Sequence, residues 1–149
     1  MRLHVKMTTD QLLQASSTSE PSQLRTTVTG MAKRSWVTVI IFWSFEDRER
    51  FEAMATEMAA TSRAEPGTLM YDWYVNEDGT SGVLLEQYAS QKALGDHVAG
   101  PVFTKIAPRY RGVARAQKVE MFGADGMERA DVLKATTTWW GEPVAAVTD

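Results

Sequence analysis

His97 is the residue of this sequence that is best suited to move a proton. It interrupts a helical stripe of apolar residues, Ala93, Leu94 and Val98, and a side chain in that stripe faces the interior of the protein rather than water. Because the pKa of imidazole lies near neutrality, such a histidine can act as a general base or bind a substrate. The alternative is a core histidine that is held in place by a hydrogen bond.

Glu86 and Tyr88 lie two residues apart, so they share one face of a strand that we predict over residues 82–89. A carboxylate that faces the core needs a partner, because burying an unpaired charge is costly. Glu86 could therefore take a direct part in proton transfer. Alternatively, it could only satisfy a buried histidine or a backbone amide.

Several aromatic residues could form the walls of a binding pocket. Tyr71 and Trp73 share one face of a predicted strand with Leu69 and Val75, and Trp43 on an earlier strand could line the same cavity. Flat aromatic substrates stack on such rings, although a row of aromatic residues at this spacing is also typical of an ordinary core. Phe103 is a further candidate, and Arg109 could meet a phenolate or a carboxylate unless it lies at the surface.

Composition excludes several kinds of partner and site. The 149 residues include 16 Lys and Arg against 19 Asp and Glu, for a net charge of −3, and they form no basic stripe, so we expect no nucleic-acid partner. Because the chain has no cysteine, disulfides, thiolate metal sites and cysteine nucleophiles are excluded. Two histidines are too few for a multi-histidine metal site, so we expect no metal.

Motifs for cofactors and membranes are also missing from the sequence. It contains neither a Gly-x-Gly-x-x-Gly pattern nor a Gly-Lys-Ser/Thr loop, so we expect no dinucleotide or phosphate-loop cofactor. The longest apolar run, Trp36 to Trp43, is far shorter than the roughly 20 residues that a membrane span needs. No pattern of a signal peptide is visible, and we therefore expect a cytoplasmic protein with no membrane partner.

The elements that must position these residues follow from the hydrophobic periodicity. It predicts strands over residues 36–44, 68–76, 82–89 and 113–122, helices over 46–63 and 90–100, and a shorter helix from Pro101. In the first helix Phe51, Met54, Ala55, Met58 and Ser62 recur at helical spacing and form its inward stripe, and Glu65-Pro66-Gly67 ends the helix. Asn76-Glu-Asp-Gly79 predicts a hairpin turn between the second and third strands.

The order strand, helix, strand, strand, helix, strand predicts an α+β fold. It is the split βαβ arrangement of ferredoxin-like type, with an antiparallel sheet and both helices on one of its faces. The other face of the sheet would leave a large apolar patch in water. We therefore expect a homodimer in which two such sheets cover each other.

We predict that the domain spans residues 36–122, with a distinct segment at each end. Residues 1–35 are rich in Ser and Thr and are predicted to form an arm that is either flexible or packed on a partner subunit, although Met31 is a possible alternative start. Residues 123–149 are predicted to form a tail with a short helix around residues 127–135. Because exposed tryptophans are costly, Trp139 and Trp140 are predicted to clasp a dimer.

The sequence resembles the antibiotic biosynthesis monooxygenase (ABM) family over about residues 36–120. The residues that carry this resemblance are Glu65-Pro66-Gly67, Tyr71, Glu86-x-Tyr88, Ala93, His97 and Pro101-x-Phe103. The resemblance implies a dimeric α+β barrel and places the strand of Glu86 beside the helix of His97. It thereby implies that Glu86 orients His97, fixing its tautomer and stabilising its imidazolium form.

The resemblance implies a cofactor-independent monooxygenase that oxidises an electron-rich phenol, quinol or anthrone with molecular oxygen. His97 would be the general base, and Tyr71, Trp73 and Tyr88 would position the rings of a small aromatic substrate. The resemblance disfavours haem degradation, because the haem-degrading branch of the family uses an asparagine in the pocket. The one asparagine of this sequence, Asn76, falls in the predicted turn. The alternatives are an isomerase of a small sugar-derived metabolite and an accessory protein that binds a ligand without turnover.

Overall fold

The structure is a computed structural model that describes residues 35–125, 127 and 133–145. All but the last residue of the predicted N-terminal arm lies outside these residues. So does most of the predicted helix around residues 127–135.

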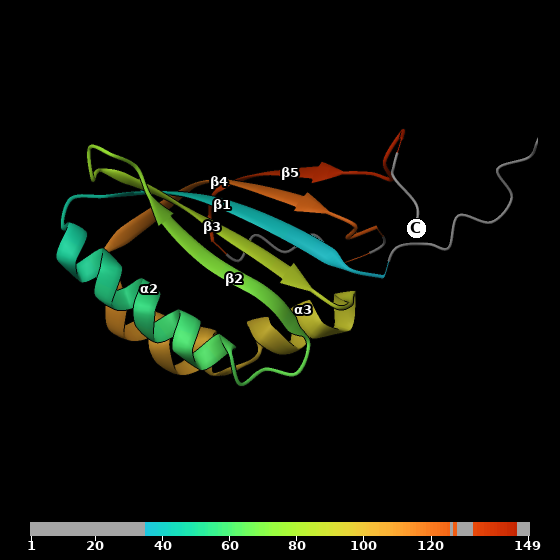
Figure 1. Ribbon diagram of the computed structural model, residues 1–149, viewed down its shortest axis with the longest axis horizontal. Helices are drawn as coiled ribbons and strands as arrows, with labels where there is room; N and C mark the ends of the chain where they lie inside the picture. Colours follow the sequence, from blue (N-terminus) through green and yellow to red (C-terminus); the bar gives the residue numbers. More distant parts are fainter. Residues whose placement is uncertain (1–34, 126, 128–132, 146–149) are drawn as a thin grey trace, which may run out of the picture. The chain divides into compact units, whose positions relative to one another are not determined.

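A five-stranded sheet with two helices on one face makes up the described part of the chain (Figure 1). Its elements are β1 (Val37–Phe45), α2 (Arg48–Ser62), β2 (Thr68–Val75), β3 (Ser81–Tyr88), α3 (Gln91–Val98), β4 (Ala114–Phe122) and β5 (Thr136–Trp140). Between α3 and β4 the chain forms a π-helical segment, η1 (Val102–Ile106), and a 3-10 turn, η2 (Ala107–Tyr110). The strand order is β2-β3-β1-β4-β5, and β1 to β4 pair antiparallel. The predicted ferredoxin-like α+β fold is therefore confirmed.

Helix α2 forms where its periodicity predicts and packs with the predicted stripe inward. Asp47 caps its first turn by accepting a hydrogen bond from the backbone N–H of Arg50. The buried residues are Phe51, Met54, Ala55, Met58 and Ser62. Phe51 stacks on Phe45 of β1, with ring centroids 4.0 Å apart, and this contact anchors the helix on the sheet.

Strand β2 departs from simple alternation at its start. The register shifts between Thr68 and Met70, which pair with Tyr88 and Gln87 of β3, so Leu69 is an extra residue in a β-bulge. The sequence pattern places Leu69 on the face of Tyr71, but the bulge changes the phase, and Leu69 is 58% exposed. That prediction was wrong for Leu69.

Strand β5 was not predicted. It pairs in parallel with β4 at the edge of the sheet, with Trp139 opposite Met121 and Trp140 opposite Phe122. Because side chains alternate along a strand, the two tryptophans point to opposite faces of the sheet. The predicted dimer clasp by these tryptophans stays a prediction.

The face of the sheet away from the helices is apolar and partly open to solvent. Ile40, Phe42, Val83 and Leu85 alternate with buried core residues of β1 and β3 and are only partly buried. Tyr74 of β2 is 52% exposed. None of the helices among the described residues has the length and hydrophobicity of a membrane-spanning segment.

Candidate active site

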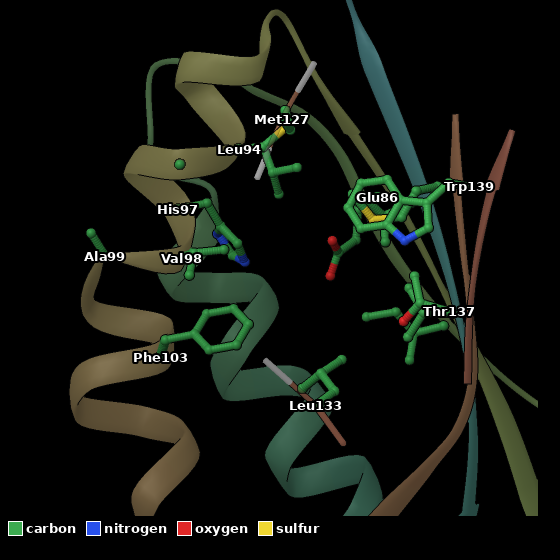
Figure 2. A pocket seen from close by; sticks show the side chains of 15 residues that line it. Glu86, Leu94, His97, Val98, Ala99, Phe103, Met127, Leu133, Thr137 and Trp139 are labelled. Atoms are coloured by element: carbon green, nitrogen blue, oxygen red, sulfur yellow. The ribbon is translucent and has the colours of Figure 1, made fainter. Parts of the chain in front are cut away.

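An apolar cavity of about 290 Å³ lies between the sheet and the segment from α3 to η1 (Figure 2). Most of its lining is aliphatic or aromatic, and Glu86 and His97 are the ionisable side chains among the described lining residues. The full lining is Val39, Ile41, Glu86, Leu94, Gly95, His97, Val98, Ala99, Phe103, Val119, Met121, Met127, Leu133, Thr137 and Trp139. A cavity of this kind, apolar with a few polar groups, is typical of a site for a small molecule.

His97 is held by a carboxylate from a loop distant in sequence. Its Nδ1 lies 2.6 Å from Oε2 of Glu65, which also accepts a hydrogen bond of 2.9 Å from the hydroxyl of Thr68. Because an ionised carboxylate can only accept hydrogen bonds, Nδ1 is the nitrogen that carries the hydrogen. The His97 side chain is 1% exposed, and its Nε2 has no hydrogen-bond partner among the described residues. Neutral His97 therefore keeps the lone pair of a buried Nε2 free to accept a proton.

The loop between α2 and β2 brings Glu65 to His97 because Gly67 allows it to approach α3 closely. A Cβ atom built on Gly67 would lie 2.3 Å from Cβ of Ala93 in α3, so a larger residue does not fit there without a shift. The carbonyl of Gly67 also accepts a hydrogen bond from the N–H of Ala89, which ties the loop to the end of β3. Glu65-Pro66-Gly67 thus does more than end a helix.

Glu86 is a buried carboxyl on the wall of the cavity, with only 4% of its surface exposed. The hydroxyl of Tyr88 donates a hydrogen bond of 3.1 Å to Glu86 Oε2. Burial raises the pKa of Glu86 to about 8, against the opposing effect of this hydrogen bond. Glu86 is therefore mainly protonated at neutral pH and can donate a hydrogen bond itself.

The expected pairing of Glu86 with His97 differs from what the structure shows. Glu65 is the carboxylate that contacts His97, and Glu86 is bonded to Tyr88. The register explains the difference in part, because Glu86 lies opposite Val39 of β1 and Tyr71 of β2 in the middle of the sheet.

Three aromatic rings surround the imidazole of His97. The ring centroids of Tyr71 and Tyr88 lie 5.2 Å from that of His97, and the ring of Phe103 meets it edge-on at 5.4 Å. Burial, and to a lesser extent Glu86, raises the pKa of the Tyr71 hydroxyl. The same two influences raise the pKa of Tyr88. Both phenols therefore remain protonated.

The predicted aromatic row is brought together, but beside the main cavity and not in its lining. Trp43, Tyr71 and Trp73 line a smaller cavity of about 50 Å³, which shares Glu86 and Phe103 with the main one. The ring centroids of Trp43 and Trp73 are 5.9 Å apart, and those of Tyr71 and Trp73 are 6.0 Å apart. These rings thus form a wall behind Glu86.

Two predicted site residues line neither cavity. Tyr88 is fully buried behind Glu86 and His97, so it supports those residues. Arg109 is 56% exposed and forms an ion pair with Glu57 of α2, whose carboxylate also accepts a hydrogen bond of 2.8 Å from the Tyr110 hydroxyl. Arg109 is therefore a surface arginine, which is the second of the two possibilities that the sequence allowed.

Two residues of the site were missed as functional candidates. Glu65 is 32 positions from His97, and no local spacing marks the pair. Trp139 lies on a strand that was not predicted, although two adjacent tryptophans in a tail already signalled a buried contact. Within the described residues, no three His, Asp or Glu side chains gather as a metal site would require.

The arrangement combines a base and an acid in an apolar setting. His97 can accept a proton at Nε2 while Glu65 stabilises the imidazolium at Nδ1, and the protonated Glu86 can donate to a ligand oxygen. Such a site can remove a proton from a bound small molecule and exclude water from the resulting anion.

Comparison with known proteins agrees with this geometry. The family model described as antibiotic biosynthesis monooxygenase matches residues 37–109, from β1 to η2. Rv0793 of Mycobacterium tuberculosis, whose name describes a proposed monooxygenase, is 39% identical over 54 residues, or 36% of this chain. The match covers 54% of Rv0793, so the chain spans about half the length of this relative.

Solved structures share the fold. The structure of Rv0793 has a TM-score of 0.53 at 27% identity and covers 65% of this chain and 97% of its own. MupZ from Pseudomonas fluorescens has a TM-score of 0.59 at 17% identity, with 75% and 95% covered. SnoaB from Streptomyces nogalater, described as a cofactor-independent oxygenase, has a TM-score of 0.54 at 19% identity, with 66% and 97% covered. Through residues 37–109, which contain Glu65, Glu86 and His97, this chain belongs to the antibiotic biosynthesis monooxygenase family.

Proposed function

We propose that this protein is a cofactor-independent monooxygenase that oxidises an electron-rich phenol, quinol or anthrone with molecular oxygen. One observation carries the proposal: a buried His97, bonded at Nδ1 to Glu65, lines an apolar cavity, and its Nε2 has no partner within the part of the chain that the structure describes. Membership of the family and the description of Rv0793 as a proposed monooxygenase support the oxygen chemistry.

In the proposed reaction His97 Nε2 takes a proton from the substrate, and Glu65 stabilises the imidazolium that forms. The substrate anion gives one electron to oxygen, and the resulting radical and superoxide combine to form a carbon–oxygen bond. The peroxide anion then takes the proton back from His97. It loses water together with the hydrogen on the same carbon, so one oxygen atom stays on that carbon as a carbonyl and the other leaves as water. The substrate itself supplies the electrons.

Glu86 would act as a neutral hydrogen-bond donor. Because its pKa is about 8, it can donate to an oxygen of the substrate on which negative charge develops, as donors in an oxyanion hole do. Phe103 and the wall formed by Trp43, Tyr71 and Trp73 would hold the substrate rings. Tyr88 would keep Glu86 in position through its hydrogen bond.

The experiment that tests the proposal measures oxygen uptake by the purified protein with a panel of quinols and anthrones. Heat-inactivated protein corrects for autoxidation, and His97→Gln removes the base while keeping a polar side chain of similar length. We expect uptake above both controls and a loss of about 10²- to 10⁴-fold in His97→Gln, as is usual for a general base. Uptake that never exceeds the controls would contradict the proposal.

A second candidate function is isomerisation by proton transfer. His97, whose Nε2 has no partner in the described ranges, and a protonated Glu86 on the same cavity could remove a proton at one position and return it at another. The two functions separate under anaerobic conditions. An isomerase would still exchange substrate hydrogen with deuterated solvent and release product, whereas a monooxygenase would release none.

We also propose that the protein acts as a homodimer. The partly open apolar face of β1 and β3, with Ile40, Phe42, Val83 and Leu85, is the surface that a second sheet would cover. Light scattering should give twice the mass of one chain. Leu85→Lys should give a monomer, whereas Glu77→Lys in the hairpin turn should not. A monomeric wild-type protein would refute this proposal.

A further inference from the structure

Part of the wall of the main cavity opposite α3 comes from the edge strand β5. Thr137 and Trp139 line the cavity from this strand, opposite Val119 and Met121 of β4. Figure 2 shows the indole of Trp139 across the cavity from His97 and Phe103. The family model ends at residue 109, so this part of the wall is built by residues that the family match does not include.

The neighbouring tryptophan of β5 has a different role. Trp140 is 47% exposed and stacks on Phe122 of β4, with ring centroids 5.9 Å apart and an angle of 10° between the rings. Trp140 is not among the residues that line either cavity. One strand thus carries two tryptophans that are alike in size, of which one faces the cavity and the other faces away.

The size of the cavity makes a single indole important. A volume of about 290 Å³ lies at the lower end of the range for small-molecule sites, roughly 300–1,000 Å³. An indole is the largest side chain that can be placed on such a wall, and its flat face suits stacking on an aromatic ligand. Removing it would enlarge the space by a large fraction, because closely packed interiors refill only in part after truncation.

We propose that Trp139 is a specificity-determining residue, whose indole limits the size of the fused-ring ligand that the cavity admits. This inference rests on the proposed function only for the class of ligand, a flat apolar ring system with a hydroxyl group. The hydroxyl group lies toward His97 and Glu86, and the far edge of the ring system lies against Trp139.

Binding of two stable phenols of different size tests the inference. We would measure the dissociation constants of 2-naphthol, with two fused rings, and 1-hydroxypyrene, with four, by the fluorescence of each probe. In the wild-type protein 2-naphthol should bind more tightly than 1-hydroxypyrene. Trp139→Ala should shift the ratio of the two dissociation constants by at least tenfold toward 1-hydroxypyrene, and Trp139→Phe should give an intermediate shift.

Trp140→Ala is the matched control, because it removes the same side chain from the same strand without touching the cavity. It should leave the ratio of dissociation constants unchanged. An unchanged ratio in Trp139→Ala, or an equal shift in Trp140→Ala, would overturn the inference. If circular dichroism shows that Trp139→Ala does not fold, the same ratio of dissociation constants is measured for Trp139→Phe and Trp139→Leu. An unchanged ratio in both variants would overturn the inference.

The result is independent of turnover. If the probes bind with the expected ratios but no substrate gives oxygen uptake, the proposed monooxygenase fails and the role of Trp139 stands. If oxygen uptake occurs and the ratio does not change, the inference fails and the proposed function stands. Failure of every variant to bind either probe would overturn the inference.

Discussion

Oε2 of Glu65 lies 2.6 Å from Nδ1 of His97, and this contact joins the loop before β2 to helix α3. The carboxylate is 17% exposed and the imidazole 1% exposed, so the pair is mostly shielded from water. A hydrogen bond with a charged partner in such a place fixes the orientation and the tautomer of the ring. Nε2 is thereby left as the nitrogen that can react.

Replacing Glu65 should weaken the base without removing it. Glu65→Gln keeps the shape but loses the charge, and a hydrogen bond to a charged group contributes about 1.5–3 kcal/mol. We therefore expect kcat/KM for oxygen uptake to fall by about ten- to a hundredfold. Glu57→Gln, a carboxylate on α2 that contacts neither cavity, is the control and should not change the rate.

A double-mutant cycle separates a positioning role of Glu65 from a general loss of stability. If Glu65 acts through His97, then adding Glu65→Gln to His97→Gln should cost little further activity. If the double variant instead loses kcat/KM by the product of the two single losses, then Glu65 acts independently of His97. The dissociation constant of 2-naphthol, measured for each variant, shows whether the cavity remains intact.

The close contact between the loop and α3 should depend on the absence of a side chain at residue 67. Gly67→Ala would place Cβ 2.3 Å from Cβ of Ala93, so the loop or the helix must shift. We expect the free energy of unfolding to fall by about 1–3 kcal/mol, as is usual for an overpacked site, and the activity to fall as well. Urea denaturation measures the first effect, and oxygen uptake measures the second.

Ala93→Gly provides the compensating change. It removes the methyl group that a side chain at residue 67 would meet, at a cost of about 1 kcal/mol for a glycine in a helix. Gly67→Ala should therefore destabilise the Ala93→Gly variant less than it destabilises the wild-type protein. Equal costs in the two backgrounds would mean that this contact does not restrict residue 67.

The fold could be predicted from the sequence because its signals are local. The stripe of α2 recurs at helical spacing, and the two-residue spacing of Glu86 and Tyr88 correctly gives the buried face of β3. The order of the elements then leaves few topologies. Leu69 was misplaced because a bulge adds one residue to a strand, and the sequence pattern alone does not reveal it.

The site was harder to predict because its contacts are distant in sequence. His97 and Glu86 were found as polar residues at core-facing positions, and both line the cavity. Glu65 was missed as the partner of His97, because it lies outside any periodic element and only the packing of Gly67 on Ala93 brings it near. Strand β5 was missed because it is five residues long and pairs in parallel at the edge of the sheet.

Arg109 should prove dispensable for the chemistry. Its ion pair with Glu57 is exposed, and exposed ion pairs contribute little to stability. We therefore expect Arg109→Ala to leave kcat/KM and the dissociation constant of 2-naphthol unchanged and the melting temperature almost unchanged. A rise in KM of tenfold or more would instead place Arg109 in contact with a phenolate or carboxylate group of the substrate.

The raised pKa of Glu86 should make the stability of the protein depend on pH. Burial raises this pKa from an ordinary value of 4.5 to about 8, so between these pH values the folded state holds a proton that the unfolded state has lost. The stabilising effect of this proton is complete below pH 4.5 and is lost as the pH rises through about 8. The expected slope is at most about 1.4 kcal/mol per pH unit.

Glu86→Gln should remove this contribution, because an amide does not titrate but can still accept the hydrogen bond of Tyr88. Urea denaturation of the wild-type protein and the variant at pH 5.5, 7 and 8.5 measures the difference in their free energies of unfolding. The wild-type protein should lose more stability than the variant between pH 5.5 and 8.5, whereas Glu77→Gln in the hairpin should follow the wild type. Parallel curves for wild type and Glu86→Gln would show that Glu86 is already ionised in the folded protein, and a neutral donor role for it would then be excluded.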